Sequence, residues 1–577
     1  MMSTKNFKRL PLGNAEFKSV RTEDYFYVDK TRYIELLERE PAKSQLFIRP
    51  RRFGKSLFLS TLSYYYDVNE AEEFEQLFGD LYIGNNPTPK RNSYAVMRFD
   101  FSGINTSCGA DTFILSFCEN VRNTIRQFLN KYKNIFPKTE QIIDQMNSES
   151  PGLAQLEWTF SIVQSAGVKI FVIIDEYDNF ASGLIRFGFV EGNDFYTSMV
   201  KNNGLVRSFY ATIKKAVQNA IVDRTFITGI SPVLLDDFTS GYNIAENLSL
   251  DVKYNEMLGF THDEVEMLKE AAGVEDQWIK INLEYYYNGY LFNKKGKNKM
   301  YNSSMILYLF NQILKTGEPP ERLIDPNLGM DTGRLEPFTK NERNRNTLIK
   351  ILTDGGIVST IEEQFSLEKL NWDEESYFIS LLFYMGFLTI KESCNGELRL
   401  VIPNFSIQTV YWTHLRDLIT KNSPEVIIST DELKKVIATA AMEGEIQSLV
   451  DYISKNVFNK LSDFDLLHFD EKYIKVMFLC YLFLNPLYIP MSEYETVPGR
   501  SDIFLQHNPK YPEARYEWVW EFKYCKTHET ELEIEAKRRD GLIQLNKYVN
   551  SHRLKDRPNL KTALIIFFGK NKYEIVM

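Results

Sequence analysis

Arg49-Pro50-Arg51-Arg52-Phe53-Gly54-Lys55-Ser56 is the stretch that decides the fold of this chain. It follows a short apolar run at 46–48 and opens into an apolar segment at 57–62, which is the order strand, loop, helix. A small residue lets backbone N–H groups approach a phosphate, Lys reaches the β- and γ-phosphates, and a hydroxyl holds Mg²⁺. The stretch therefore predicts a nucleotide-binding loop, although the general P-loop pattern has Gly where this chain has Arg49. The predicted cofactor-binding residues are Arg52, Phe53, Gly54, Lys55 and Ser56, with Ser56 also a magnesium ligand.

A second stretch supports this interpretation. Residues 168–174 form a nearly continuous apolar run, typical of a central parallel strand that is buried on both faces. The run ends in Asp175-Glu176-Tyr177-Asp178. In P-loop enzymes an acidic residue at the end of a neighbouring strand holds Mg²⁺, and an adjacent Glu can orient the attacking water. We therefore expect Asp175 to bind the cofactor and its metal and Glu176 to be catalytic. The alternative is a strand that simply ends in a polar turn.

Composition sets outer limits on the architecture. The chain has 577 residues, which predicts two to four domains, and 44% hydrophobic residues, which is ample for packed cores. Five scattered cysteines without a C-x-x-C pair argue against a disulfide framework and a structural zinc site. The first residues lack the apolar core of a signal peptide. The longest uncharged apolar run, 476–492, falls short of the roughly 20 residues of a spanning helix. It predicts a buried helix followed by a strand, so we expect a cytoplasmic protein without membrane segments.

Charge is distributed unevenly along the chain. The net charge is −9, yet residues 500–577 carry 15 Lys and Arg against 11 Asp and Glu. That end is therefore +4 and the rest −13. A basic end on an acidic protein points to a polyanionic partner there, although ordinary fluctuation explains the same numbers.

Helix and strand patterns alternate around the two motifs. We expect helices at 32–39, 111–131 and 152–166, and strands at 94–101 and 225–229. Such alternation predicts a parallel α/β sheet, in which ligands bind at the carboxyl ends of the strands. Lys55, Asp175 and Thr228 lie at or just past strand ends, so one cleft can collect them. Thr228 would there sense the γ-phosphate, or else be a strand-end hydroxyl satisfied by the sheet.

A small module follows. Residues 381–403 read as helix, turn and β-hairpin, which predicts a helical or winged connector. A winged element can touch DNA, but we favour a spacer or partner surface.

The carboxyl-terminal region contains a candidate metal site. A short strand at 501–505 carries Asp502, and a second at 516–523 carries Glu521 and Lys523. Strand side chains alternate with period two, so Glu521 and Lys523 share a face, and strand pairing would add Asp502. Two carboxylates can hold Mg²⁺ while Lys523 orients water or steadies developing charge. Asp502, Glu521 and Lys523 are thus predicted to be catalytic, with Asp502 and Glu521 as metal ligands. The alternative is a hairpin with solvated charges.

Taken in order, the motifs resemble a known family. They are Leu10-Pro11-Leu12-Gly13, Tyr27-Val28-Asp29-Lys30-Thr31, the 49–56 loop, Asp175-Glu176-Tyr177-Asp178 and Thr228-Gly229-Ile230-Ser231-Pro232. This series resembles the bacterial AAA-ATPase-like proteins that carry a PD-(D/E)XK nuclease domain at the carboxyl end. Arg49 agrees with that family's own loop. The resemblance implies ATP binding and leaves ATP turnover open.

The carboxyl-terminal half adds matches to the same family. The resemblance places Glu471 near the metal and identifies Gln544 and Tyr548, on one helix face, with the family's Gln-x-x-x-Tyr. It implies nucleic acid as partner, with DNA favoured over RNA, and leaves a homo-oligomer open.

We therefore expect an α/β chain of three parts: a P-loop NTPase domain with a parallel sheet (1–315), a helical or winged connector (316–430), and a restriction-endonuclease-like α/β domain (431–577). The expected cofactors are ATP and Mg²⁺, and the expected reaction is hydrolysis of nucleic-acid phosphodiester bonds under nucleotide control. A nucleotide-dependent regulatory protein whose nuclease fold only binds is the first alternative, and a plain ATPase motor is the second.

Overall fold

The computed structural model of the chain describes residues 7–105, 110–136, 143, 152–179, 199, 204–232, 244–325, 332–339, 341–363, 374–461, 470–496, 499–526, 528–570 and 572–577. It divides into two compact units. The first comprises 1–279, 287–325 and 358–403, and the second comprises 280–286, 326–357 and 404–577.

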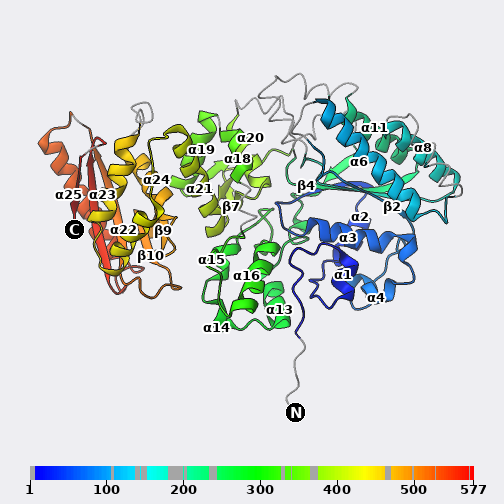
Figure 1. Ribbon diagram of the computed structural model, residues 1–577, viewed down its shortest axis with the longest axis horizontal. Coiled ribbons are helices and arrows are strands. Elements are labelled where there is room, and N and C mark those ends of the chain that lie inside the picture. Colours follow the sequence, from blue (N-terminus) through cyan, green and yellow to red (C-terminus); the bar gives the residue numbers. More distant parts are fainter. Residues whose placement is uncertain are drawn as a thin grey trace, which may run out of the picture. The chain divides into compact units, whose positions relative to one another are not determined.

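A five-stranded parallel sheet forms the centre of the first unit (Figure 1). Its spatial order is β2-β3-β4-β1-β5, and every neighbouring pair is parallel. The strands are β1 (Ser44–Ile48), β2 (Ala95–Asp100), β3 (Ile170–Asp175), β4 (Val222–Gly229) and β5 (Ala245–Asn247). All residues of β1 and β3 are buried, as expected for strands covered on both faces.

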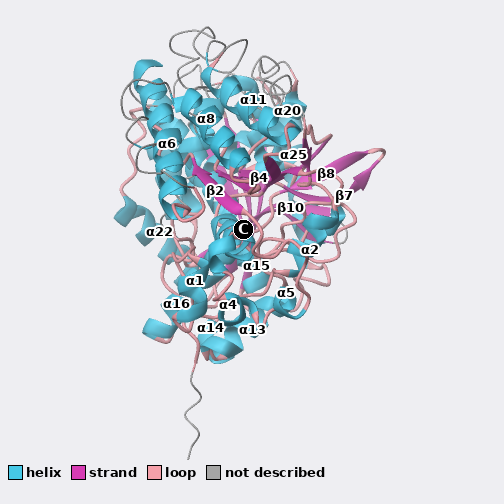
Figure 2. Cartoon of the chain, turned by 90° about the vertical axis from the view of Figure 1, so that its right-hand side faces the viewer, coloured by secondary structure: helices cyan, strands magenta, loops and turns pink. Residues whose placement is uncertain are grey.

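Helices cover both faces of this sheet. Helix α3 (Lys55–Tyr66) lies on one side, and α6 (Ala110–Lys131), α8 (Gly152–Ser165) and α11 (Leu205–Gln218) lie on the other (Figure 1). In the turned view, the strands lie between these three helices and α1 (Phe17–Thr22) with α4 (Phe74–Phe78) (Figure 2). The unit also contains α2 (Arg32–Arg39), η1 (Val68–Glu70), α5 (Tyr82–Asn85), η2 (Val252–Tyr254), α13 (His262–Ala272), α14 (Asp276–Ile279) and α16 (Ser303–Thr316).

A helix and a three-stranded sheet complete the first unit. Helix α20 (Glu375–Tyr384) precedes the hairpin of β7 (Thr389–Cys394) and β8 (Glu397–Val401), and β6 (Ile357–Ser359) pairs with β8. Thr389 Oγ1 donates to Gly289 O at 3.0 Å and accepts from Leu291 N at 2.7 Å. The predicted helix, turn and hairpin are confirmed, and the module packs on the unit that contains the 49–56 loop.

The second unit is built on a mixed five-stranded sheet of order β13-β12-β11-β10-β9. Only the β11–β12 pair is parallel, and α25 (Glu531–Val549) connects these two strands. The strands are β9 (Tyr488–Thr496), β10 (Gly499–His507), β11 (Glu517–Cys525), β12 (Leu560–Phe568) and β13 (Lys572–Val576). Phe478 of α24 (Glu471–Leu482) stacks on Phe522 and packs edge-to-face on Trp520, while Leu545 and Tyr548 of α25 pack with Phe504 and Val519.

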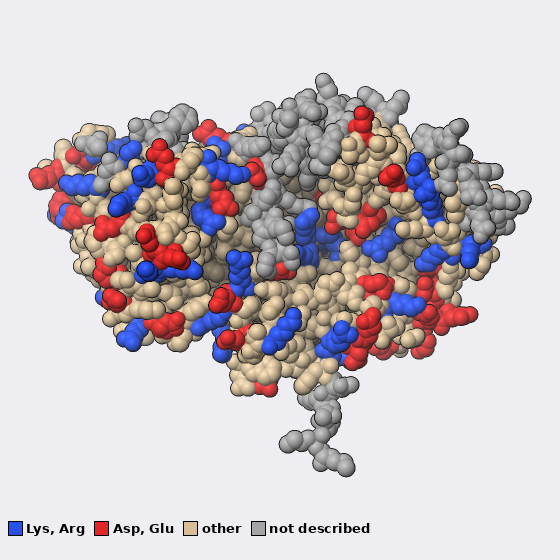
Figure 3. Space-filling view, viewed as in Figure 1, with Lys and Arg blue, Asp and Glu red and all other residues tan. Residues whose placement is uncertain are grey.

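The remaining helices of the second unit precede this sheet in the chain. They are α18 (Thr332–Thr339), α19 (Glu342–Thr353), α21 (Phe405–Asn422), α22 (Thr430–Met442), α23 (Gln447–Asn456) and η3 (Phe458–Lys460), with α15 (Leu283–Tyr287) at the junction of the units. On the face drawn in Figure 3, basic and acidic side chains of the described residues are interspersed. Within the described ranges, no helix combines the length and apolarity that crossing a membrane requires.

Most of the element predictions agree with this structure. The helices at 32–39, 111–131 and 152–166 and the helix–strand succession over 476–492 are confirmed within one or a few residues. Strand β3, which ends in Asp175, is separated from β1 by β4, and the sequence predicted no strand order. The segment predicted as one connector, 316–430, contributes residues to both units.

Candidate functional site

The 49–56 loop joins the end of β1 to the start of α3 in the first unit. Gly54 has φ +91° and immediately precedes the helix, and Arg52 has φ +65°. A positive φ costs a non-glycine residue of order 1–3 kcal/mol and tends to occur at functional sites. The loop thus carries backbone strain directly before the amino end of a 12-residue helix, where N–H groups and the helix dipole favour an anion.

Lys55 is the buried cation of this loop. Its Nζ donates to Arg49 O at 3.0 Å and to Pro50 O at 2.9 Å, and the residue is 7% exposed. Burial lowers the pKa of Lys55 to about 8, with Asp175 as the largest opposing charge. A buried ammonium that has only carbonyl partners and lies near carboxylates is suited to an anionic phosphate.

Arg49 explains why this loop departs from the general pattern. Its guanidinium donates to Ile48 O and Ser249 O through Nη1 and to Tyr254 O through Nη2, at 2.7–2.9 Å. It also lies between the rings of Phe47 and Phe292, 4.1 and 4.0 Å from their centroids. The residue is 1% exposed, and burial lowers its pKa to about 9. Arg49 is therefore an internal tie between the loop and distant parts of the chain.

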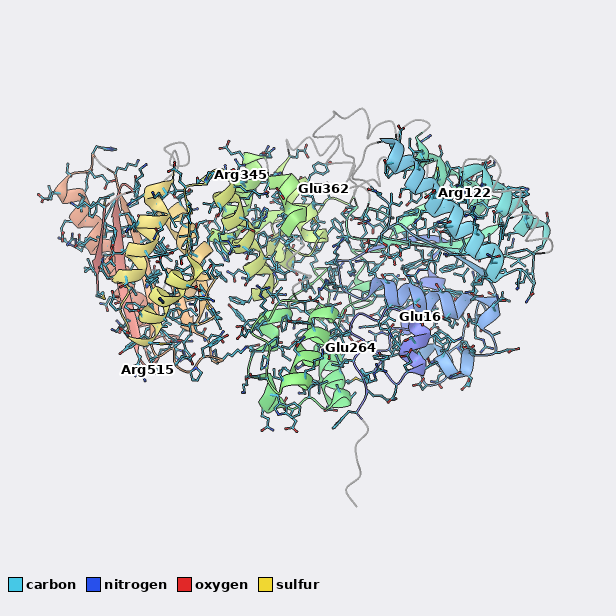
Figure 4. All side chains as sticks on the ribbon, in the orientation of Figure 1. Glu16, Arg122, Glu264, Arg345, Glu362 and Arg515 are labelled. Carbon is cyan, nitrogen blue, oxygen red and sulfur yellow. The ribbon has the colours of Figure 1, made fainter. Side chains whose placement is uncertain are left out.

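A cavity of about 460 Å³ adjoins the loop. Its wall includes residues 51–58 of the loop and α3, the amino-terminal stretches 11–15 and 26–28, and residues of the 258–260 and 303–307 segments. Glu176 and Lys30 also line it. Lys30 Nζ is paired with Glu264 of α13, which Figure 4 labels. The size and mixed lining suit a nucleotide whose phosphates reach Lys55.

The three acidic residues at the end of β3 have different surroundings. Asp175 is buried, accepts from Glu176 N and lies 3.3 Å from Arg98 Nη2. Glu176 has φ +49°, and burial raises its pKa while Arg51 opposes the shift most strongly. Asp178 accepts from Ile230 N, Ser231 N and Ser231 Oγ, so it ties the loop after β3 to the loop after β4. Among the three acids, Glu176 alone is part of the cavity wall described above.

Three predicted cofactor residues have other engagements. Thr228 Oγ1 donates to Phe47 O at 2.7 Å, which agrees with the alternative of a strand-end hydroxyl satisfied by β1, and its role as a γ-phosphate sensor stays a prediction. The Phe53 ring is 1% exposed and packs edge-to-face on Tyr290 and Phe292, which leaves its backbone for a ligand. The Arg52 guanidinium pairs with Asp325. Arg52, Phe53, Gly54, Lys55, Ser56 and Glu176 all line the same cavity, whereas Thr228 is not among its lining residues.

The second candidate site lies where β10 and β11 separate. The strands pair from Ile503–Leu505 to Trp518–Trp520. Beyond this, the Phe522 N–H donates to Asp502 Oδ2 at 2.9 Å, and the Tyr524 N–H donates to Glu471 Oε1 at 3.1 Å. Side-chain carboxylates therefore accept hydrogen bonds from the β11 N–H groups that would bond to β10 if the two strands stayed paired. This opening places Asp502 of β10 and Glu471 of α24 beside β11.

Glu521 and Lys523 complete this cluster, as their shared strand face predicts. Lys523 Nζ donates to Glu521 Oε1 at 3.0 Å and to Gln544 Oε1 of α25 at 2.9 Å. Asp540 Oδ2 is a further 3.7 Å contact of Lys523. Glu521 and Lys523 are 5% and 8% exposed. Asp502 lies close enough for its charge to act on Glu521, so the three side chains are neighbours, and their catalytic role stays a prediction. Gln544 faces this group, whereas Tyr548 belongs to the apolar core.

Burial governs the electrostatics of the group. It raises the pKa of both carboxyl groups, Asp502 and Glu521, and their mutual repulsion adds to the rise at Glu521. Burial acts to lower the pKa of Lys523, but Glu521 and Glu471 outweigh it, so that pKa is raised. Glu521 Oε2 is buried without a hydrogen-bond partner among the described residues. A buried, unpartnered carboxylate oxygen beside a second carboxylate favours a bound cation.

The donor set fits Mg²⁺ on these grounds. Mg²⁺ is usually held by one or two carboxylates together with waters and substrate oxygens, which Asp502 and Glu521 can supply. Across the described ranges, no three His, Cys, Asp or Glu side chains group closely enough to form a metal cage. Glu471, predicted as a third ligand, accepts from Tyr524 N through Oε1, and its charge acts on both Asp502 and Glu521, so its role as a metal ligand stays a prediction.

One charged residue at this site was not predicted. Lys475 of α24 is 3% exposed, and its Nζ lies 3.7 Å from Asp502 Oδ1. Its sequence signal is the spacing of four from Glu471, which places both residues on one helix face. Lys475 was not predicted because the residues that follow it in the sequence are apolar and indicate a buried helix.

The fold and the two sites define an α/β chain with a P-loop NTPase core and a carboxyl-terminal nuclease-like domain. Comparison with known families agrees: the family described as "Predicted AAA-ATPase" matches residues 11–239, and the PD-(D/E)XK nuclease superfamily matches residues 469–576. The chain carries one domain of each kind.

Individual proteins add little to this assignment. An "Uncharacterized protein in vnfD 5'region" of Azotobacter chroococcum mcd 1 is 25% identical over 418 residues, covering 70% of this chain and 68% of that protein. Among solved structures, the Aeropyrum pernix ORC1 protein in complex with DNA covers 71% of this chain and 97% of its own, with 8% identity and a TM-score of 0.28. Likeness at that level carries no functional argument.

Proposed function

We propose that the chain is an ATP-binding, Mg²⁺-dependent nuclease that hydrolyses nucleic-acid phosphodiester bonds under nucleotide control. The observation that carries the proposal is the buried cluster of Asp502, Glu521 and Lys523 at the opening between β10 and β11. Two further features indicate a nucleic-acid substrate. Residues 469–576 match the PD-(D/E)XK nuclease superfamily, and residues 500–577 carry a net positive charge.

Each side chain of the nuclease site has a separate task. Asp502 and Glu521 would hold Mg²⁺, which when bound polarises the phosphodiester and acidifies a water. Asp502 is oriented by the Phe522 N–H, and Lys523 by Glu521 and Gln544. Lys523 would orient the attacking water or stabilise the negative charge that develops on the phosphate. Burial of the cluster strengthens these interactions.

The nucleotide site would act as the control element. Gly54 and the amino end of α3 would hold the phosphates, with Lys55 as their cation and Ser56 with Asp175 for Mg²⁺. Glu176 is the candidate for orienting a water, because it lines the cavity beside the loop. We further propose that the chain hydrolyses the bound ATP and that it forms a homo-oligomer. We place the protein in the cytoplasm.

A second candidate function has one specific observation in its favour. The carboxylates of the nuclease site already have internal partners, since Lys523, Phe522 N and Tyr524 N occupy Glu521, Asp502 and Glu471. These internal bonds, each to one oxygen of a carboxylate, suit a nucleotide-dependent regulatory protein whose nuclease fold binds nucleic acid without cleaving it.

The experiment that separates the two is a matrix of cleavage assays. Labelled single- and double-stranded DNA and RNA are incubated with the full chain, with and without Mg²⁺, Mn²⁺ and ATP. We expect metal-dependent cleavage, with DNA preferred over RNA and a rate that changes on adding ATP. Lys55→Ala should keep cleavage but lose the ATP response. Binding without cleavage under every condition would leave the regulatory alternative.

A further inference from the structure

A second lysine reaches the nuclease carboxylates from a different element of the fold than Lys523. Lys523 reaches Glu521 along strand β11, whereas Lys475 reaches Asp502 from helix α24. Each of the two carboxylates therefore has a buried ammonium group beside it. The reaction as described above uses only Lys523.

Lys475 is a charged residue on the buried, mainly apolar part of helix α24. Its helix neighbours Ile474, Val476 and Met477 are all buried apolar residues, and the Lys475 side chain itself is 4% exposed. The 3.7 Å approach to Asp502 Oδ1 is therefore a largely buried ion pair at the site and not a surface one, and in such surroundings the charge of Lys475 acts strongly on Asp502. The other lysine of the same helix, Lys472, differs: its side chain is 60% exposed and pairs with Asp354.

We propose that Lys475 is a second nucleic-acid-directed lysine, whose ammonium opposes a divalent cation at Asp502 and contacts a non-bridging phosphate oxygen once nucleic acid is bound. The inference rests on the proposed nuclease function. A dication and an ammonium that share one carboxylate repel each other, and an incoming phosphodiester relieves that repulsion because it is negative. Lys475 thereby couples metal binding to substrate binding, so that metal affinity is higher with nucleic acid than without it.

This role predicts opposite changes in two measurements. Without nucleic acid, Lys475→Met should tighten Mn²⁺ binding by about tenfold, because one repelling charge is gone. With nucleic acid and saturating Mg²⁺, the same variant should cleave about 10²-fold more slowly, the usual scale for losing one donor to a reacting phosphate or oxyanion. Lys475→Arg keeps the charge and should keep the weaker metal binding.

The test uses the full chain and reads Mn²⁺ affinity by calorimetry, and cleavage under single-turnover conditions. Lys472→Met is the matched control on the same helix and should change neither quantity. A loss of both metal binding and cleavage in Lys475→Met, or no change in either, overturns the inference while the wild type still cleaves. If the wild type itself binds no Mn²⁺, the proposed function fails together with the inference.

Discussion

Replacing Arg49 with Gly would restore the general P-loop pattern, yet the structure predicts that it damages the protein. Arg49 donates to three carbonyl oxygens, of Ile48, Ser249 and Tyr254, and lies between two aromatic rings. In Arg49→Gly these carbonyls lose the guanidinium donors, although Tyr254 O keeps the Met257 N–H, and a cavity opens in the core.

The size of the effect follows from these contacts. A buried carbonyl left without its donor costs roughly 1–3 kcal/mol, and a desolvated cation over a ring contributes roughly 2 kcal/mol. The cost of burying the guanidinium offsets part of this, as its pKa of about 9 indicates. We expect a net loss of about 3–5 kcal/mol, the scale for breaking a buried charged network.

The assay is thermal unfolding of the full chain, followed by ATP titration. The transition of the first unit should fall by about 3–10 °C, since a large unit shifts by only about one or two degrees per kcal/mol. Arg39→Ala, whose side chain is 70% exposed, is the control and should shift little. Unchanged melting together with tighter ATP binding in Arg49→Gly would refute the structural role of Arg49.

Three further predictions concern both units. Lys55→Ala should abolish ATP binding by calorimetry while the circular dichroism spectrum stays unchanged, because Lys55 bonds only loop carbonyls; retained affinity would exclude the proposed phosphate site. Glu176→Gln should bind ATP normally but reduce any ATP turnover by at least about 10²-fold, and equal turnover would remove its catalytic role. His414, whose pKa burial lowers to about 4, is neutral in the fold and binds a proton in the unfolded chain below about pH 6.5. Stability should therefore be full above pH 6.5 and fall by about 3 kcal/mol towards pH 4. His414→Gln should flatten that fall in urea titrations, and an unchanged slope would assign acid sensitivity elsewhere.

Local sequence was enough for the parts of both sites that lie within one loop or strand. Gly54 and Lys55 follow a strand and open a helix, and this order fixes their place at the helix amino end. Glu521 and Lys523 share a face because strand side chains alternate. Both predictions depend only on residues that lie within a few positions of one another in the sequence.

Features that depend on distant partners could not be read from the sequence. The role of Arg49 requires Ser249 and Tyr254, about two hundred residues further along the chain. The position of Asp175 one strand away from β1 depends on sheet order, which periodicity does not encode. The sequence left Thr228 as either a sensor or a satisfied strand-end hydroxyl, and its bond to Phe47 O of the neighbouring strand agrees with the second.

The measurement that tests the central claim most directly is cleavage and binding of nucleic acid by Lys523→Ala beside the wild type. The wild type should cleave with Mg²⁺, and Lys523→Ala should not. Binding, measured with Ca²⁺ over a range of salt, should weaken little in the variant, with a salt dependence lower by about one phosphate contact. Equal cleavage by Lys523→Ala, or a wild type that never cleaves with any divalent metal, would contradict the account.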